Sequence, residues 1–115
     1  MLDFSRYVAG PYCAALLDFL GANIIRIEKI GASEDRYIAP VAASGEGGVC
    51  LQTACNKRSI CIDLGAVEAR DVVATPVASA DVGAANLPTQ WLQRHGLDYA
   101  SLCAIRPDIT LAEPE

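Results

Sequence analysis

Apolar positions change their spacing several times along this chain, and each change predicts a new secondary-structure element. A short apolar segment at residues 2–5 predicts a strand, and Pro11 opens a helix predicted over residues 12–20, which has leucines along one side. Gly21 stands where a left-handed helix cap is wanted, and residues 23–28 form a nearly continuous apolar strand, typical of parallel sheets. Strand, helix and strand in this order predict a βαβ unit with a right-handed crossover.

The rest of the chain continues the alternation with weaker signals. Residues 31–48 contain glycine, serine and proline without a sustained period, so they predict a long surface loop. A strand at 59–64 precedes a helix at 66–78, which Pro76 should truncate or kink. The weakest elements are a strand at 80–86, helices at 88–95 and 99–105, and a strand that begins at 109–111. This order favours an open α/β sheet, in one domain spanning residues 1–115.

Composition narrows the classes of protein that fit this pattern. The chain is 52% apolar but rich in alanine, which predicts a thin core, and its net charge of −5 argues against a nucleic-acid or membrane-surface partner. Five cysteines without a C-x-x-C pair, and a single histidine, favour a reducing cytoplasm and no metal site. No apolar run is long enough to span a bilayer, and no signal peptide is recognisable at the N-terminus.

Candidate chemistry is sparse. A basic turn at residues 55–60, which includes Lys57 and Arg58, is either a docking point for a polyanion or a solvated turn. Glu28 ends a strand where dinucleotide-binding folds place a ribose-binding acid, but the glycine fingerprint of those folds is missing. We therefore expect Glu28, and the acidic pair at residues 34–35, to be solvated. His95 has no Ser or Cys partner in a recognisable motif, so a structural role is expected.

Several spaced motifs occur in the order found in a known family. They are Leu2-Asp3-Phe4-Ser5, Ala9-Gly10-Pro11-Tyr12-Cys13, Leu20-Gly21-Ala22-Asn23-Ile24-Ile25-Arg26-Ile27-Glu28-Lys29, Asn56-Lys57-Arg58-Ser59-Ile60, Asp63-Leu64, Ala80-Asp81-Val82, Asn86, Arg94, Gly96-Leu97-Asp98-Tyr99, Leu102 and Pro107. With these motifs the chain resembles the N-terminal part of the class III coenzyme A (CoA) transferases. This family includes formyl-CoA transferase, the carnitine CoA-transferases and α-methylacyl-CoA racemase.

The resemblance implies a fold, a substrate and a set of contacts. It implies the N-terminal portion of a Rossmann-like large domain, in a homodimer whose two subunits are linked like rings. The substrate would be CoA or acyl-CoA, with no covalently bound cofactor. Carried over position by position, the CoA contacts fall on Tyr7, Val8, Ala9, Lys29, Ile62, Asn86, Leu87 and Arg94.

The resemblance also implies that no catalytic residue lies within residues 1–115. The family's catalytic Asp, which forms a mixed anhydride and then an aspartyl-CoA thioester, lies beyond this region, and Asp81, Asp98 and Asp108 match other family positions. The segment that begins at Asn86 departs locally from the usual Asn-Phe-x-Pro-Gly pattern. Three hypotheses therefore stay open: part of a CoA-transferase, part of an acyl-CoA racemase of the same family, or a non-catalytic CoA- or nucleotide-binding module.

Overall fold

The structure is a computed structural model that describes residues 1–113, and strands and helices alternate through it. The strands are β1 (Leu2–Asp3), β2 (Ile25–Glu28), β3 (Arg58–Cys61), β4 (Val82–Ala84) and β5 (Thr110–Ala112). The helices are α1 (Ala9–Phe19), the short 3₁₀ helix η1 (Glu34–Tyr37), α2 (Gly48–Thr53), α3 (Ala69–Ala78), α4 (Thr89–His95) and α5 (Tyr99–Ile105). The predicted α/β class is confirmed.

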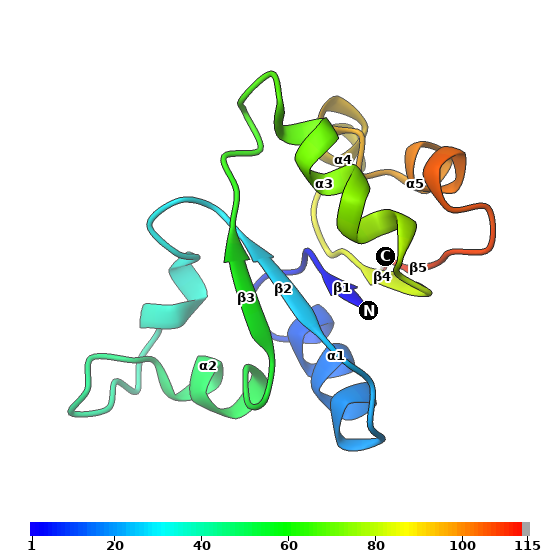
Figure 1. The fold of residues 1–115 in the computed structure, drawn as a ribbon. Coiled ribbons are helices and arrows are strands. Elements are labelled where there is room, and N and C mark those ends of the chain that lie inside the picture. The colour runs from blue at the N-terminus through cyan, green and yellow to red at the C-terminus, as the bar shows by residue number, and fades with distance from the viewer. Residues whose placement is uncertain (114–115) are drawn as a thin grey trace.

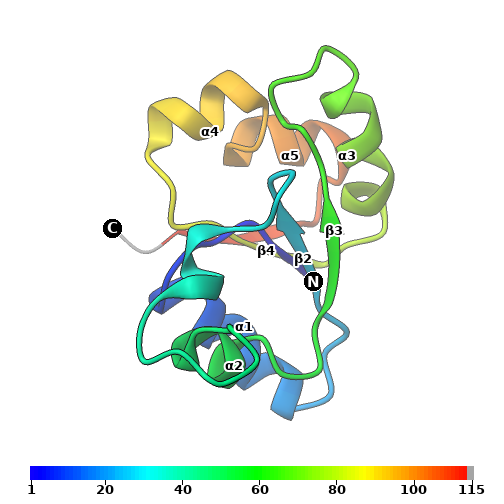
Figure 2. The same ribbon diagram turned by 90° about the vertical axis from the view of Figure 1, so that its left-hand side faces the viewer.

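The five strands form one open, all-parallel sheet in the order β3-β2-β1-β4-β5. Helices α1 and α2 cover one face, and α3, α4 and α5 cover the other, as the two views show (Figures 1 and 2). The chain builds the sheet outward from β1 to β3 and then crosses to β4 on the other side of β1. The strand order therefore reverses between β1 and β4, which defines a topological switch point.

The two faces of the sheet differ in chemistry because side chains alternate along each strand. Leu2, Phe4 and Ile27 belong to an apolar core that includes buried residues of α3, α4 and α5. On the opposite face, Asp3 pairs in register with Arg26, and their neighbours on that face include Glu28, Ser59 and Ser5. Within residues 1–113, the apolar core therefore lies on the face toward α3, α4 and α5.

Helix α1 packs closely on the polar face through small residues. The buried residues of α1 include four small ones, Gly10, Pro11, Ala14 and Ala15. A Cβ atom at Gly10 would overlap the side chain of Ser5, so this approach requires glycine. The helix starts at Ala9, three residues before the predicted start.

The other differences from the sequence prediction are local. The expected loop at residues 31–48 contains η1, and α2 follows directly, because a six-residue helix in a glycine-rich segment gives almost no periodic signal. Helix α3 starts at Ala69, three residues after the predicted start, and continues for two residues beyond Pro76, so the proline lies in its last turn but does not truncate the helix before the predicted end. Helix α5 and the left-handed Gly21 agree with the prediction. Within residues 1–113, no helix is long and apolar enough to cross a membrane.

Candidate functional site

The candidate site lies at the carboxyl ends of the parallel strands, around the switch point between β1 and β4. In open α/β sheets, ligands bind in the crevice outside these strand ends. The connection from β1 to α1 and the segment after β4 meet there, and they carry five of the predicted contacts. Those five residues are Tyr7, Val8, Ala9, Asn86 and Leu87.

Asn86 joins the two connections directly. Its Oδ1 atom accepts from the backbone N–H of Arg6 at 2.6 Å, and its Nδ2 atom donates to the Arg6 carbonyl at 2.7 Å. Both the oxygen and the nitrogen of the Asn86 amide are thus hydrogen-bonded within the protein, to the two backbone groups of one residue, as in strand pairing. Asn86 therefore holds the β1–α1 connection, and its predicted contact with CoA stays a prediction.

The connection itself is bent at Tyr7, which has a φ of 64°, in the left-handed region that residues with side chains rarely adopt. The side chains of Tyr7 and Val8 are exposed, so packing does not hold this bend. The backbone N–H of Tyr7 donates to Asp35 Oδ2 at 3.0 Å. The connection is thus fixed by polar contacts at Arg6, to the segment after β4, and at Tyr7, to η1.

A buried network of charges lies beneath this connection, on the polar face of the sheet. Arg26 Nη2 donates to both carboxylate oxygens of Asp35, at 2.7 and 2.6 Å, and the two side chains are 1% and 2% exposed. Arg36 binds Glu28 through Nε and Nη2, at 2.8 and 2.6 Å, and Ser59 donates to the same carboxylate. Arg26 and Arg36 thus converge on Glu28.

These contacts shift the pKa of Glu28. Burial raises it, but the hydrogen bonds from Arg36 and Ser59 and the charge of Arg26 outweigh that effect and lower the pKa from 4.5 to about 2. The same hydrogen bond to Glu28 is the main cause of a raised pKa at Arg36. The prediction that Glu28 and the acidic pair at 34–35 are solvated was wrong for Glu28 and Asp35, because Arg36 and Arg26 pair with them inside the fold.

The basic turn at residues 55–60 is built into the fold as well. Lys57 Nζ donates to Asp3 Oδ2 at 2.9 Å and to the Pro11 carbonyl at 2.7 Å, and its side chain is 1% exposed. Asn56, which has a φ of 61°, donates from Nδ2 to Asp18 of α1. The contacts of Asn56 and Lys57 are structural: they fasten the turn to α1 and β1.

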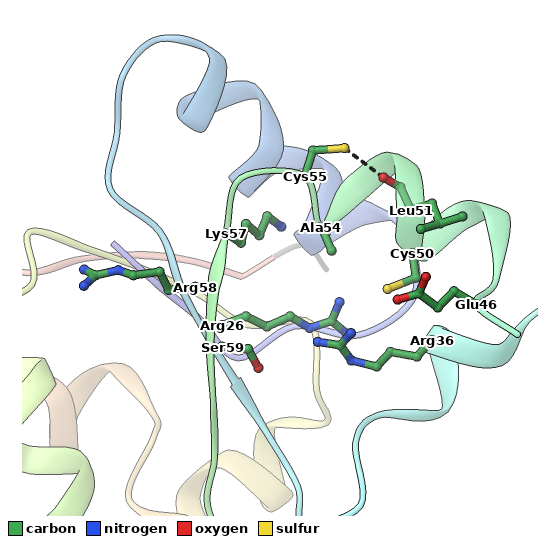
Figure 3. A pocket seen from close by; sticks show the side chains of 10 residues that line it. All are labelled: Arg26, Arg36, Glu46, Cys50, Leu51, Ala54, Cys55, Lys57, Arg58 and Ser59. Carbon is green, nitrogen blue, oxygen red and sulfur yellow. Dashed lines mark hydrogen bonds between the residues drawn. The ribbon is translucent and has the colours of Figure 1, made fainter. Parts of the chain in front are cut away.

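A cavity of about 330 Å³ opens beside this network, between α2 and the edge of β3. Figure 3 shows Arg26 and Arg36 in it, whereas Arg58 points away. Its Arg26 and Lys57 are committed to buried carboxylates, so little of its positive charge is available to a ligand. A smaller cavity, of about 210 Å³, lies near the switch point and is lined by Ala9, Gly10, Cys13, Ala84, Ala112 and Glu113.

The three remaining predicted contacts, Lys29, Ile62 and Arg94, are spread along the same edge. Lys29 directly follows β2 and is exposed, in an ion pair with Glu34. Ile62 follows β3 but is only 7% exposed and packs in the core. Leu87 packs partly against that core, and Arg94 is an exposed residue of α4. The structure thus brings Tyr7, Val8 and Ala9 to Asn86, and leaves Lys29 and Arg94 on separate elements.

Sequence reasoning missed Arg26, Asp35 and Arg36. A signal was present, because an arginine within the apolar strand Ile25–Glu28 must be buried and therefore needs a carboxylate partner. What the sequence could not show was which carboxylate it meets. Asp35 is nine residues away, on an element that was predicted to be loop.

Comparison with known proteins assigns the family. The profile of CoA-transferase family III matches residues 1–113, and the chain belongs to this family. Succinyl-CoA:mesaconate CoA-transferase from Haloarcula hispanica is 31% identical over 113 residues, which are 95% of this chain and 28% of that protein. Succinyl-CoA:glutarate CoA-transferase from Mus musculus is 32% identical over 110 residues, 95% of this chain and 25% of that protein.

A solved structure supports the same assignment. The crystal structure of a CAIB/BAIF family protein from Brucella suis superimposes with a TM-score of 0.86 at 33% identity. The match covers 97% of this chain and 31% of that one. The chain thus spans less than a third of the length of these relatives.

Proposed function

We propose that this chain carries a CoA-binding region of a family III CoA-transferase and corresponds to the N-terminal portion of its large domain. The observation that carries the proposal is the placement of the predicted contacts at one edge of the sheet. Seven of them follow the carboxyl ends of β1, β2, β3 and β4, and Arg94 lies on the helix after β4. CoA would lie across this edge, with its phosphates toward Lys29 and Arg94.

The reaction we propose for the parent enzyme is the transfer of CoA between carboxylic acids. The names of the relatives support this class, since the two cited above are succinyl-CoA transferases. By the family's mechanism, an aspartate would attack the acyl-CoA, release the CoA thiolate and form a mixed anhydride. The thiolate would then attack the aspartyl carbonyl, which frees the first acid and leaves an aspartyl-CoA thioester. No residue of this chain is assigned the role of that aspartate.

A second candidate is a CoA-binding module without catalysis, and the contacts of the aspartates favour it. Asp98 caps α5 by accepting from Ser101, which lowers its pKa, and Asp81 pairs with Arg106. Asp3 and Asp35 are buried in ion pairs. The racemase of the same family is the remaining alternative, and nothing in these residues favours it over transfer.

Calorimetric titration with CoA tests the proposal. We expect saturable binding by the wild-type chain, and at least tenfold weaker binding by the Lys29→Ala/Arg94→Ala double variant. The matched control is Arg58→Ala/Arg106→Ala, which removes the same charge at the opposite edge, where β3 begins and where Arg106 meets Asp81 before β4. Equal loss in both double variants would indicate a nonspecific charge effect. No binding by a folded wild-type chain would refute the proposal.

An exchange assay tests the assignment of no catalytic residue to this chain. A transferase region without its catalytic residue should bind CoA and give no CoA exchange between succinate and a second carboxylic acid. Turnover by the purified 115-residue chain would contradict the assignment of no catalytic residue to it.

A further inference from the structure

The β1–α1 connection keeps an unfavourable backbone shape at a position where its side chains are exposed. Tyr7 has a φ of 64°, and the side chains of Tyr7 and Val8 are exposed. A residue with a side chain adopts this conformation only where its surroundings enforce it. The contacts that enforce it are therefore the features to identify.

Two side chains, those of Asn86 and Asp35, form hydrogen bonds with adjacent residues of the connection. Asn86 bonds both backbone groups of Arg6, and Asp35 Oδ2 accepts from the Tyr7 N–H at 3.0 Å. The Arg6 guanidinium adds hydrogen bonds to the carbonyls of Phe4, Ser5 and Ile27. Asn86 thus fixes the position of Arg6, and Asp35 acts on the next residue, where the backbone bends.

Asp35 is held in turn by the sheet. Arg26 lies within β2 and clamps both oxygens of Asp35 through Nη2. The carboxylate is therefore held by a residue of the sheet as well as by the helix η1 that carries it. The chain of contacts runs from the interior of β2, through Asp35, to the backbone N–H of Tyr7.

Stability alone does not explain the Arg26–Asp35 pair. Within residues 1–113, Arg26 Nε and Nη1 are buried without a hydrogen-bond partner, although Nε lies 3.4 Å from Glu28. Removing two charges from water is costly, and apolar side chains of similar volume often stabilise a fold as well or better. The pair is better explained by what it holds in place.

We propose that Asp35, fixed by Arg26, is a positioning residue that sets the β1–α1 connection in the shape that binds CoA. This inference rests on the proposed function, because Tyr7, Val8 and Ala9 are the contacts proposed there. A preset backbone spares the ligand the cost of ordering it. If the connection adopts the binding shape only about a tenth of the time without Asp35, the apparent affinity falls about tenfold.

The test compares Asp35→Asn with a matched variant, Arg36→Gln. Both break an ion pair of the same network, fully buried for Asp35 and partly buried for Arg36, but of the two only Asp35 contacts the β1–α1 connection. The two readouts are hydrogen exchange at the Tyr7 amide of the unliganded chain, by NMR, and CoA affinity by calorimetry. If Asp35→Asn does not fold, Asp35→Glu, which keeps the charge and moves the carboxylate, is measured instead.

We expect Asp35→Asn to speed exchange at Tyr7 at least tenfold more than at the Leu102 amide and to weaken CoA binding about tenfold. Arg36→Gln should change both readouts less than twofold, whatever it does to the melting temperature. The inference is overturned if Tyr7 exchange rises only in step with Leu102, or if Arg36→Gln weakens CoA binding as much. A wild-type chain that does not bind CoA would instead refute the proposed function, and the exchange data would still decide whether Asp35 holds the connection.

Discussion

The two faces of the sheet bury different kinds of side chain. Toward α3, α4 and α5 the strands present leucine, isoleucine and phenylalanine, and the core there is apolar. Toward α1 and η1 they present Asp3, Arg26 and Glu28, all buried and all paired with charges from other elements. Apolar contacts stabilise without direction, whereas charged pairs stabilise little but fix geometry. The difference teaches that one sheet combines a nondirectional apolar core on one face with directional charged pairs on the other.

The largest effect should follow from breaking a pair on the charged face. Arg26→Met leaves Asp35 and part of Glu28 without their buried partner, and we expect a loss of about 3–5 kcal/mol in the free energy of unfolding. Urea denaturation followed by circular dichroism measures it. The double variant Arg26→Met/Asp35→Leu should recover a large part of that loss. A double variant no more stable than the single would show that the pair itself contributes net stability.

On the apolar face, the expected loss arises from a cavity. Leu102 of α5 is fully buried, and Leu102→Ala should cost about 2–5 kcal/mol. Leu20→Ala is the control, since Leu20 is 83% exposed and its truncation should change stability by about 0.5 kcal/mol or less. The two variants are compared in the same urea titration. Similar midpoints for both would contradict the placement of the core on this face.

Acid should weaken the charged face selectively. The pKa of Glu28 is about 2 in the folded chain against 4.5 as its ordinary value, so its contribution is complete above pH 4.5 and is lost as pH falls from 4.5 toward 2. The contribution amounts to at most about 3 kcal/mol. Unfolding is measured at several pH values for wild type and Glu28→Gln. The variant should show a shallower loss of stability in this window, and an equal slope would refute the shift.

The smallest effect on stability concerns the outer side of α1, which faces solvent. Four apolar side chains are exposed there: Tyr12, Leu16, Phe19 and Leu20. The opposite side of the helix packs on the polar face of the sheet. Exposed apolar side chains at this helical spacing favour association between chains. Phe19→Ser/Leu20→Ser should change the free energy of unfolding by about 0.5 kcal/mol or less. Light scattering should show that it also lowers the associated fraction, and undiminished association would place the contact elsewhere, for example on the open edge of β3.

Most of the fold could be predicted because apolar spacing reports local structure. The βαβ start and α5 follow from the positions of apolar residues, glycine and proline. The same spacing could not reveal the charged face, because Asp3 and its partner Lys57 are 54 residues apart and meet only after the strands are aligned. Long-range ion pairs leave no periodic signal.

The candidate site was predictable to a similar extent. Family resemblance located the segments, and the parallel sheet brings their strand ends to one edge. What neither could give was the use of individual polar atoms, such as the amide of Asn86, which bonds the backbone of Arg6 at both ends. The role of a polar side chain depends on the hydrogen bonds that it forms within the protein.

Lys57 has a practical consequence for following this chain in solution. The sequence contains only two lysines, and the folded chain exposes Lys29 while it encloses the ammonium of Lys57 between Asp3 and the Pro11 carbonyl. An amine-reactive label should therefore modify Lys29 and the N-terminus at once, and Lys57 only when α1 separates from β1. Mass spectrometry of the labelled chain would thus report, at one residue and without any substitution, how often this layer opens.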